Sequence, residues 1–521
     1  MTKRFLLKLD NLANVIKEQC ELRKLWLLLG FSVVYWFSTC LLASRKLMWN
    51  DELFTFYTSR LPKVSDIWGA LLTGADQIPP LFHLITRAAF ALFGVNSLSV
   101  RLPEVLGFWV MSLCLFRFVW KRSSALYGFA AMLFPLVTAA YDYGYEARPY
   151  GVVLGFSGLS LVFWQSATDG HYRKISLVAL GLALAAAVST HYYAILLLVP
   201  LVLGESVRSI ARRRLDPGVW VAFGCSLIPL LLFLPLLERA ASYSGAFWAR
   251  PDWRSLLEFY YFLLIPALVP LVSLLLFSAL YTAINPTGDN PFTREPRPTP
   301  PLQEIMAALG FLLIPIVAVI LGVLVTHAFT DRYVLSAVAG FSILFAFAAY
   351  GMLSGRAIIG VFFVFVLCSG FMVVIVHQLG KMTAAAQELT QTYRFLQSQN
   401  ETTLPIVAAD LHTFMRLKYY APQDIGSRLV YLADPQAALE YLRYDTVDRG
   451  ILDLEPWFQL NVQEYGRYVM SRRRFFLYGQ PGFLNWLFYK LPEDKMQIEL
   501  KGRNGDDLLF LVSVRDKQPL N

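Results

Sequence analysis

The sequence predicts an α-helical protein that crosses a membrane many times and ends in a water-soluble α/β domain. Of its 521 residues, 56% are hydrophobic and only 16% are charged, whereas about a quarter are charged in an ordinary soluble domain. Apolar stretches recur from Leu25 to about Ile375, and several reach the roughly twenty residues that a membrane-spanning helix needs. From Gly380 onward charged residues alternate with short apolar runs, which indicates a soluble domain of small size.

The chain begins with a basic segment, residues 1–24, which we interpret as a cytoplasmic amphipathic tail. A cleaved signal peptide would have a short apolar core and a small-residue cleavage site. Residues 25–42 are longer than such a core and end without that site, so they are predicted to form the first spanning helix. The predicted organisation is therefore a tail over 1–24, a membrane domain over 25–379 and a soluble domain over 380–521.

About eleven apolar segments are expected to span the membrane, judged by their length and hydropathy. They are residues 25–44, 101–120, 123–140, 149–167, 175–190, 192–207, 218–237, 256–283, 304–327, 333–352 and 356–377.

The charges of the connecting segments support this arrangement. With the N-terminus inside, every cytoplasmic connection is basic, as the positive-inside rule requires. An odd number of spans then places the C-terminal domain outside. The basic residues concerned are Lys121, Arg122, Arg173, Lys174, Arg208, Arg212, Arg213, Arg214, Arg294, Arg297 and Arg356.

One further apolar stretch, residues 79–94, is not counted as a span. It is short, and His83, Thr86 and Arg87 lie on one stripe of its predicted helix. Counting it as a span would place the basic loops outside. We therefore expect an amphipathic helix in the outer interface, within a long external loop over residues 44–101.

Secondary structure in the soluble domain is predicted from short apolar runs. The segments LPIVAAD, SRLVYLAD, RFFLYG and DLLFLVSV are expected to form strands, and LHTFMRLKYY, PQAALEYLR and PGFLNWLFYKL helices. This alternation predicts a small α/β sandwich. Residues 285–301, rich in Pro, Thr and Asn, are expected to be an irregular cytoplasmic linker.

Composition also argues against several classes of site. The soluble domain contains none of the five cysteines, so neither a disulfide framework nor a thiolate metal site is expected. The net charge of +9 arises largely from short loops that fix orientation, so no nucleic-acid partner is expected. We expect no cofactor and no metal, because the predicted outer loops contain no aspartate-any-aspartate motif.

Polar residues that interrupt the apolar pattern all fall on the outer side in this topology. Ionisable groups at such depth are costly and are usually retained by pairing or by function. The candidate site residues are Asp51, Glu52, Arg101, Asp142, Glu146, Arg148, His191 and Arg332.

Each of these residues also has a structural interpretation. Asp51 and Glu52 are equally well explained as solvated loop acids, and a single arginine is better explained by snorkelling to lipid headgroups. Glu146 with Arg148, and Asp331 with Arg332, are also typical of structural ion pairs. A histidine such as His191 is more often packed than catalytic.

The combination nevertheless suggests a chemistry. A carboxylate removes a proton from an acceptor hydroxyl, while arginines hold a phosphate and stabilise the charge it gains as its bond breaks. A phosphate leaving group is a weak base, so neither a general acid nor a metal is required. Outside the cytoplasm an activated group has to arrive on a lipid carrier, which a membrane-embedded enzyme can reach.

Four segments, in their order along the chain, resemble motifs of the C-type multispanning glycosyltransferases that use polyprenyl-phosphate sugars. This group contains the protein O-mannosyltransferases and the lipid A aminoarabinose transferases. WNDEL resembles the acidic motif of their first external loop, and IPPLFHLITRAAFALFG resembles the helix after it. VRLPEVLGFW and YEARPYG resemble the entry to the second span and the end of the third. The resemblance covers about Leu25 to Tyr350.

The resemblance implies that Asp51 is the general base, that Glu52 orients the acceptor or the loop, and that Arg101, Arg148 and Arg332 contact the donor phosphate. It implies inverting, metal-independent transfer of a sugar from polyprenyl phosphate to a hydroxyl of a glycan, lipid or protein on the outer face. Members often carry His or Lys immediately before the Pro-Pro pair. Here Gln77 and Ile78 occupy that stretch, so a cationic contact is not expected there.

Two other classes of function are alternatives to this interpretation. A lipid or polysaccharide transporter would be expected to show internal repeats or paired half-helices, and the sequence indicates neither. A non-catalytic membrane scaffold would bind a partner through the C-terminal domain, and it would tolerate alanine at Asp51. The terminal KQPLN is no endoplasmic-reticulum retrieval signal, which favours a bacterial inner (plasma) membrane.

Overall fold

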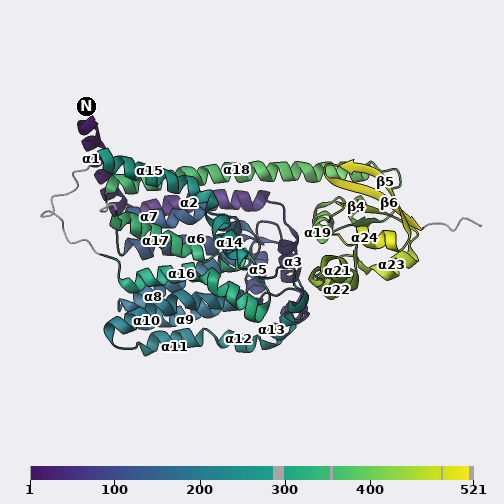
Figure 1. The fold of residues 1–521 in the computed structure, drawn as a ribbon, viewed down its shortest axis with the longest axis horizontal. Helices are drawn as coiled ribbons and strands as arrows, with labels where there is room; N and C mark the ends of the chain where they lie inside the picture. Colours follow the sequence, from purple (N-terminus) through teal and green to yellow (C-terminus); the bar gives the residue numbers. More distant parts are fainter. Residues whose placement is uncertain (1, 285–298, 353–355, 483–484, 515–521) are drawn as a thin grey trace, which may run out of the picture.

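The computed structural model describes residues 2–284, 299–352, 356–482 and 485–514. A helical bundle occupies one end of the molecule and a domain built on a sheet occupies the other (Figure 1). One long helix, α18 (Ala357–Gln397), runs from the bundle to that domain. The boundary expected at residue 379 lies within α18, and strands begin only at Ile406.

The helices up to α18 occupy all eleven segments predicted to span. They are α1 (Thr2–Leu22), α2 (Lys24–Arg45), α3 (Asn50–Ser59), α4 (Val64–Leu71), α5 (Pro80–Phe93), α6 (Leu102–Trp120), α7 (Ala125–Leu133), η1 (Phe134–Val137), η2 (Ala139–Tyr145), α8 (Tyr150–Thr168), α9 (Arg173–Thr190), η3 (Tyr192–Leu197), α10 (Leu198–Arg212), α11 (Pro217–Cys225), α12 (Ile228–Leu232), α13 (Leu234–Ala241), η4 (Ser244–Ala246), α14 (Arg254–Leu264), η5 (Ile265–Ala267), α15 (Leu268–Ile284), α16 (Leu302–Leu321), η7 (Gly322–Thr326), η8 (Asp331–Val334) and α17 (Ala337–Met352).

Within the described residues, eight helices are long and apolar enough to cross a membrane, and up to ten if each of two bent pairs is one span. The bent pairs are residues 125–145, with a bend of 79°, and residues 217–246, with a bend of 65°. Helix α17 has only 16 residues. The multispanning architecture is confirmed, and the count of eleven stays a prediction. Residues 285–298 of the expected linker lie outside the described residues.

Close contact between α6 and α8 depends on glycine. A Cβ atom on Gly155 of α8 would lie 2.7 Å from the backbone oxygen of Gly107 in α6. Small residues allow two helix backbones to approach in this way inside a membrane. Because α6 begins directly after Arg101 and α8 directly after Pro149, this packing also sets the distance between two segments of the candidate site.

Ion pairs hold the helices together at the end of the bundle opposite the sheet domain. Lys121, after α6, pairs with Asp169, after α8, at 2.5 Å. Arg122 pairs with Glu304 in the first turn of α16, also at 2.5 Å. These pairs satisfy two of the basic residues that the sequence assigns to the cytoplasmic connections.

The C-terminal domain is a six-stranded sheet with strand order β3-β2-β1-β4-β6-β5. Strands β3, β2, β1 and β4 are parallel to one another. Strand β6 pairs antiparallel with β4, and β5 pairs antiparallel with β6. Its elements are β1 (Ile406–Ala408), α19 (Leu411–Tyr420), α20 (Gln423–Gly426), β2 (Leu429–Ala433), α21 (Pro435–Leu442), α22 (Thr446–Phe458), β3 (Val462–Glu464), α23 (Tyr465–Ser471), β4 (Arg474–Gly479), α24 (Leu487–Glu493), β5 (Met496–Asn504) and β6 (Asp507–Val514).

The hydrophobic core of this domain continues into the outer loops of the bundle. Ile406 and Phe414 of the domain belong to the same buried cluster as Leu53 and Phe56 of α3. Helix α19 packs on α3, and the rings of Tyr419 and Phe56 lie 5.1 Å apart. The domain is thus packed directly onto the helix that carries Asp51.

Candidate active site

Asp51 lies in the first turn of α3, immediately after the chain leaves α2. The backbone N–H of Trp49 donates to Oε2 of Glu52 at 3.4 Å, so Glu52 helps to satisfy the free N–H groups at this helix start. Adjacent positions of a helix point in different directions. Asp51 therefore faces the cavity described below, whereas Glu52 faces the protein interior.

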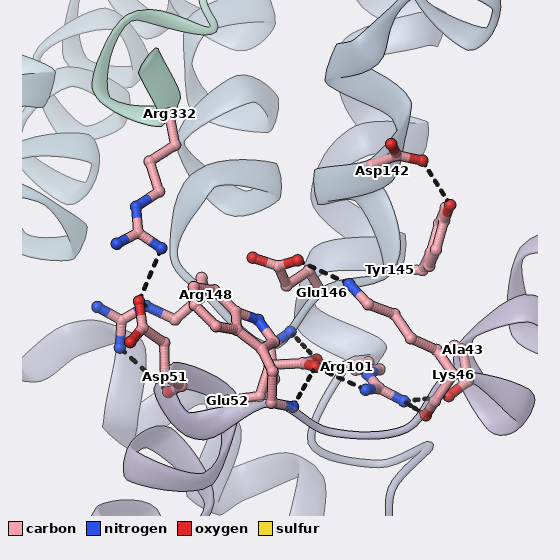
Figure 2. A network of polar contacts seen from close by, with 12 residues as sticks. Ala43, Lys46, Asp51, Glu52, Arg101, Asp142, Tyr145, Glu146, Arg148 and Arg332 are labelled. Atoms are coloured by element: carbon pink, nitrogen blue, oxygen red, sulfur yellow. Dashed lines mark hydrogen bonds and ion pairs between the residues drawn. The ribbon is translucent and has the colours of Figure 1, made fainter. Parts of the chain in front are cut away.

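Glu52 forms a fully buried ion pair with Arg101. Nε and Nη2 of Arg101 donate to the two carboxylate oxygens of Glu52 at 2.6 and 2.8 Å. Nη1 donates to the backbone oxygens of Ala43 and Lys46, and the N–H of Ala147 donates to Glu52 (Figure 2). Burial alone would raise the pKa of Glu52, but the charges of Arg101 and Lys46 and the hydrogen bonds from Arg101 and Ala147 together lower that pKa.

This pair joins four chain segments next to the site. It connects the end of α2, the start of α3, the start of α6 and the segment before α8, and neither residue lines the cavity. The structure therefore does not place Arg101 where a donor phosphate would bind, because all three guanidinium nitrogens already donate to protein oxygens.

Asp51 faces two other arginines. Nη1 of Arg332 lies 2.7 Å from Oδ2 of Asp51, and Nε of Arg148 lies 4.0 Å from the same atom. Nη1 of Arg148 also donates to the backbone oxygen of Asp51 at 3.3 Å. Arg332 comes from η8, some 280 residues along the chain. Figure 2 shows Arg332 and Arg148 reaching Asp51 from different elements.

Asp76 is a site residue that the sequence reasoning missed. It lines the same cavity, and its Oδ1 lies 3.8 Å from Nη1 of Arg148. Its Oδ2 lies 3.2 Å from Nε2 of His83 in α5. Burial alone would raise the pKa of Asp76, but its interactions with His83 and Arg148 lower it. The available signal was its place directly before Gln77 and the Pro-Pro pair in an outer loop.

The two further predicted acids, Glu146 and Asp142, differ in whether they line the cavity. Glu146 lines the cavity and pairs with Lys46 at 2.6 Å, while burial raises its pKa. Asp142 accepts from Tyr145 at 2.6 Å and from Gln378 of α18 at 2.7 Å. Asp142 does not line the cavity, so the structure separates it from the rest of the predicted group.

His191 is in the cavity wall but is not a cation. Its ring lies 4.9 Å from Tyr333 and 5.5 Å from Tyr150, and its Nδ1 accepts from the backbone N–H of Tyr193. Burial lowers the pKa of His191 to about 3, and the charges of Arg148 and Arg332 contribute to the same shift. His191 is therefore neutral and shapes the wall.

The cavity that these residues line has a volume of about 1110 Å³ and lies between the bundle and the sheet domain. Bundle residues that line it include Asp51, Asp76, Arg148 and Arg332. Asp410, Asp448 and Trp486 of the sheet domain line it too. Ligand pockets in proteins are as a rule about 300 to 1,000 Å³, so this cavity is large for a binding site.

This arrangement places a cavity-facing carboxylate next to two guanidinium groups. Asp51 presents a carboxylate oxygen to the cavity, and two guanidinium groups lie beside it. The Arg332 guanidinium also lies over the rings of Trp49 and Tyr150, at 5.3 and 5.9 Å from their centroids. Stacking fixes the plane of the guanidinium, which suits bidentate contact with a phosphate.

Comparisons with known proteins give consistent results. Residues 77–238, less than half of the chain, match the family model described as dolichyl-phosphate-mannose-protein mannosyltransferase. No curated protein sequence matches the chain.

Two solved structures of ArnT from Cupriavidus metallidurans share the fold. The apo structure aligns with a TM-score of 0.58 at 13% identity, covering 94% of this chain and 97% of that one. The structure bound to undecaprenyl phosphate aligns with a TM-score of 0.53, with the same identity and coverage. The family model and the shared fold agree with the resemblance seen in the motifs: this chain has the multispanning membrane fold of these ArnT structures, and residues 77–238 are similar to the mannosyltransferase family.

Proposed function

We propose that the chain moves one sugar from a polyprenyl phosphate carrier to a hydroxyl of an acceptor on the outer face of the membrane. The observation on which this rests is the position of Asp51, 2.7 Å from Arg332 and 4.0 Å from Arg148 at a cavity wall. A base and a phosphate-binding pair are the two parts that such a transfer requires. The matched ArnT structure, which contains undecaprenyl phosphate, supports a polyprenyl phosphate carrier.

The proposed reaction is a single displacement. The acceptor oxygen attacks the anomeric carbon, the bond from that carbon to the phosphate oxygen breaks, and Asp51 takes the hydroxyl proton. Polyprenyl phosphate leaves with the electron pair, and Arg148 and Arg332 stabilise its new charge. Attack opposite the leaving group inverts the anomeric configuration, and no metal is needed because the two guanidinium groups supply the positive charge.

The ion pair of Asp51 with Arg332 suggests an order of events. In the free protein Arg332 donates to Asp51, which occupies the carboxylate oxygen that would accept a proton. A donor phosphate competes for the same guanidinium because its two non-bridging oxygens share a negative charge and can accept from both arms of the guanidinium. Arrival of the donor would thus free Asp51 to act on the acceptor.

The remaining candidates are assigned by their contacts. We propose that Glu52 and Arg101 are positioning residues, because their buried pair joins the four segments around Asp51. Asp76 orients Arg148. Glu146, held by its pair with Lys46, forms the adjacent part of the cavity wall. Asp142, bonded to Tyr145 and Gln378, ties η2 to α18 rather than binding substrate.

The lipid tail is proposed to enter beside η4. Phe247 and Trp248, which follow η4, line the cavity, and Trp248 is 50% exposed. Aromatic residues of this kind gather at the membrane interface. A polyprenyl chain lying against them would remain in lipid while its phosphate reached Arg148.

The charge pattern supports a position of the sheet domain on the non-cytoplasmic side, which in the proposed bacterial inner (plasma) membrane is the periplasmic or extracellular side. The basic connections around Lys121 and Arg122 lie at the end of the bundle away from the sheet domain. The cavity lies at the other end, where donors on a lipid carrier would be presented.

The test is turnover of a panel of polyprenyl-phosphate sugars by purified protein in nanodiscs, wild type against Asp51→Asn. The wild type should release polyprenyl phosphate from one donor, and the variant should be slower by about 10²-fold to 10⁴-fold. Circular dichroism and thermal unfolding of the variant should match the wild type. Equal activity of the two proteins would overturn the role of Asp51, and no turnover of any donor would favour a transporter or a scaffold.

A further inference from the structure

The carboxyl ends of two parallel strands open into the cavity from the sheet domain. Asp410 follows β1, and Gln480, Pro481 and Gly482 follow the neighbouring strand β4. From β1 the chain crosses to β2, which lies on one side of the β1–β4 pair. From β4 it continues to β5 and β6, which lie on the other side. Open α/β sheets bind ligands at such a point, where the direction of the connections reverses.

Several polar groups at this edge are buried without a partner. Asn485 is only 5% exposed, and although its Nδ2 donates to the oxygen of Gln480 at 2.6 Å, its Oδ1 has no partner among the described residues. In the same part of the chain, Oγ1 of Thr446 and Nε of Arg416 are also buried and unbonded. All three residues line the cavity. Buried polar atoms of this kind usually have a partner, and a ligand would supply one.

The chemistry of this edge suits a neutral sugar. Asp410, Asp448 and Asp507 provide carboxyl groups, and the aromatic residues Tyr444 and the largely buried Trp486 also line this edge. Carboxyl and amide oxygens accept from hydroxyl groups, while an aromatic ring covers the apolar face of a sugar ring. Asp448 is buried and accepts from Nε1 of Trp486 at 3.2 Å, and burial raises its pKa to about 7. Three carboxyl groups against one arginine disfavour a polyanionic acceptor.

A chain of contacts joins this edge to Asp51. The ring of His412 in α19 is stacked on that of Trp49 with centroids 6.0 Å apart and an interplanar angle of 13°. Arg332 also lies over Trp49, and it pairs with Asp51. A ligand at the strand ends therefore shares one cavity wall with the proposed base.

We propose that the sheet domain is the acceptor-binding half of the enzyme and that its strand ends bind the sugar rings of a neutral saccharide acceptor. The proposal rests on the transferase function above and names the acceptor class for the same cavity. The rings bind at Thr446, Asn485 and Trp486, and the reacting hydroxyl extends towards Asp51. The donor occupies the half of the cavity that contains Arg148 and Arg332.

The test measures binding of neutral trisaccharides to the full chain in nanodiscs by saturation-transfer difference NMR. At least one trisaccharide should bind the wild type. Thr446→Val, which replaces one small side chain by another, and Asn485→Ala should each weaken that binding roughly fivefold to tenfold. Glu440→Gln, an exposed carboxylate-to-amide change on α21 outside the cavity, is the matched control and should leave it unchanged.

Three outcomes would overturn the proposal: no trisaccharide binds, binding is unchanged in both edge variants, or a serine- and threonine-containing peptide or a phosphorylated saccharide binds at the edge instead.

Donor turnover in the same preparations separates the acceptor-site proposal from the proposed transferase function. Arg148→Gln should reduce turnover but preserve trisaccharide binding. Turnover without binding at the edge would contradict only the acceptor site, and binding at the edge without turnover of any donor would contradict only the transferase function.

Discussion

At the scale of single residues, neighbouring acids in the sequence have separate tasks. Asp51 faces the cavity and two arginines, whereas Glu52 is buried against Arg101. The motif WNDEL located both acids, and the assignment of Asp51 as base stays a proposal that the geometry supports. Sequence spacing did not reveal that the guanidinium of Arg101 donates hydrogen bonds to Glu52, Ala43 and Lys46. Those partners are brought together only by packing.

Glu52→Gln should destabilise the protein rather than change its chemistry alone. The substitution leaves the Arg101 guanidinium buried without its counter-charge, and breaking a buried pair in this way costs roughly 3–5 kcal/mol. The thermal unfolding midpoint in detergent should fall clearly, and transfer should be lost with it. Asp51→Asn is the matched comparison, since it should lose transfer at an unchanged midpoint. An unchanged midpoint for Glu52→Gln would argue against a positioning role.

At the scale of elements, apolar segments were predictable and mostly exposed strands were not. The four predicted strand segments contain β1, β2, β4 and β6, which are apolar runs that are buried in full or in part. Strands β3 and β5 are mostly exposed, so neither has the apolar pattern that marks a strand. The helix expected over residues 79–94 is present as α5, Pro80–Phe93.

Packing of α6 on α8 gives a prediction at this scale. Gly155→Ala places a Cβ 2.7 Å from the backbone oxygen of Gly107, so the two helices must separate, at about 1–3 kcal/mol. Because α8 begins just after Arg148, we expect both a lower unfolding midpoint and slower transfer. Gly224→Ala in α11, where no atom lies within 4 Å, is the control and should leave both unchanged. Equal behaviour of the two variants would contradict a role for this packing.

At the scale of the whole molecule, the site exists only because two parts of the chain meet. The bundle supplies Asp51, Arg148 and Arg332, and the sheet domain closes the cavity from the other side. Charge and hydropathy predicted which end of each helix faces outward. They gave no information on Asp76 or on the contact of His412 with Trp49, since both depend on how loops and domain fold over each other.

Metal chelation tests the charge balance of the whole site. Because two arginines supply the positive charge for the departing phosphate, prolonged treatment with EDTA should leave the transfer rate unchanged. Added Mg²⁺, Mn²⁺ or Zn²⁺ should not increase it. A rate that falls on chelation and returns with one metal would show that the guanidinium groups do not act alone.

The anomeric configuration of the product tests the central claim most directly. We expect NMR of the purified product to show the configuration opposite to that of the donor, because Asp51 activates the acceptor for direct attack from the face away from the phosphate. Retention of configuration would require an intermediate bonded to the enzyme. It would contradict the proposed role of Asp51 as the base in a single displacement.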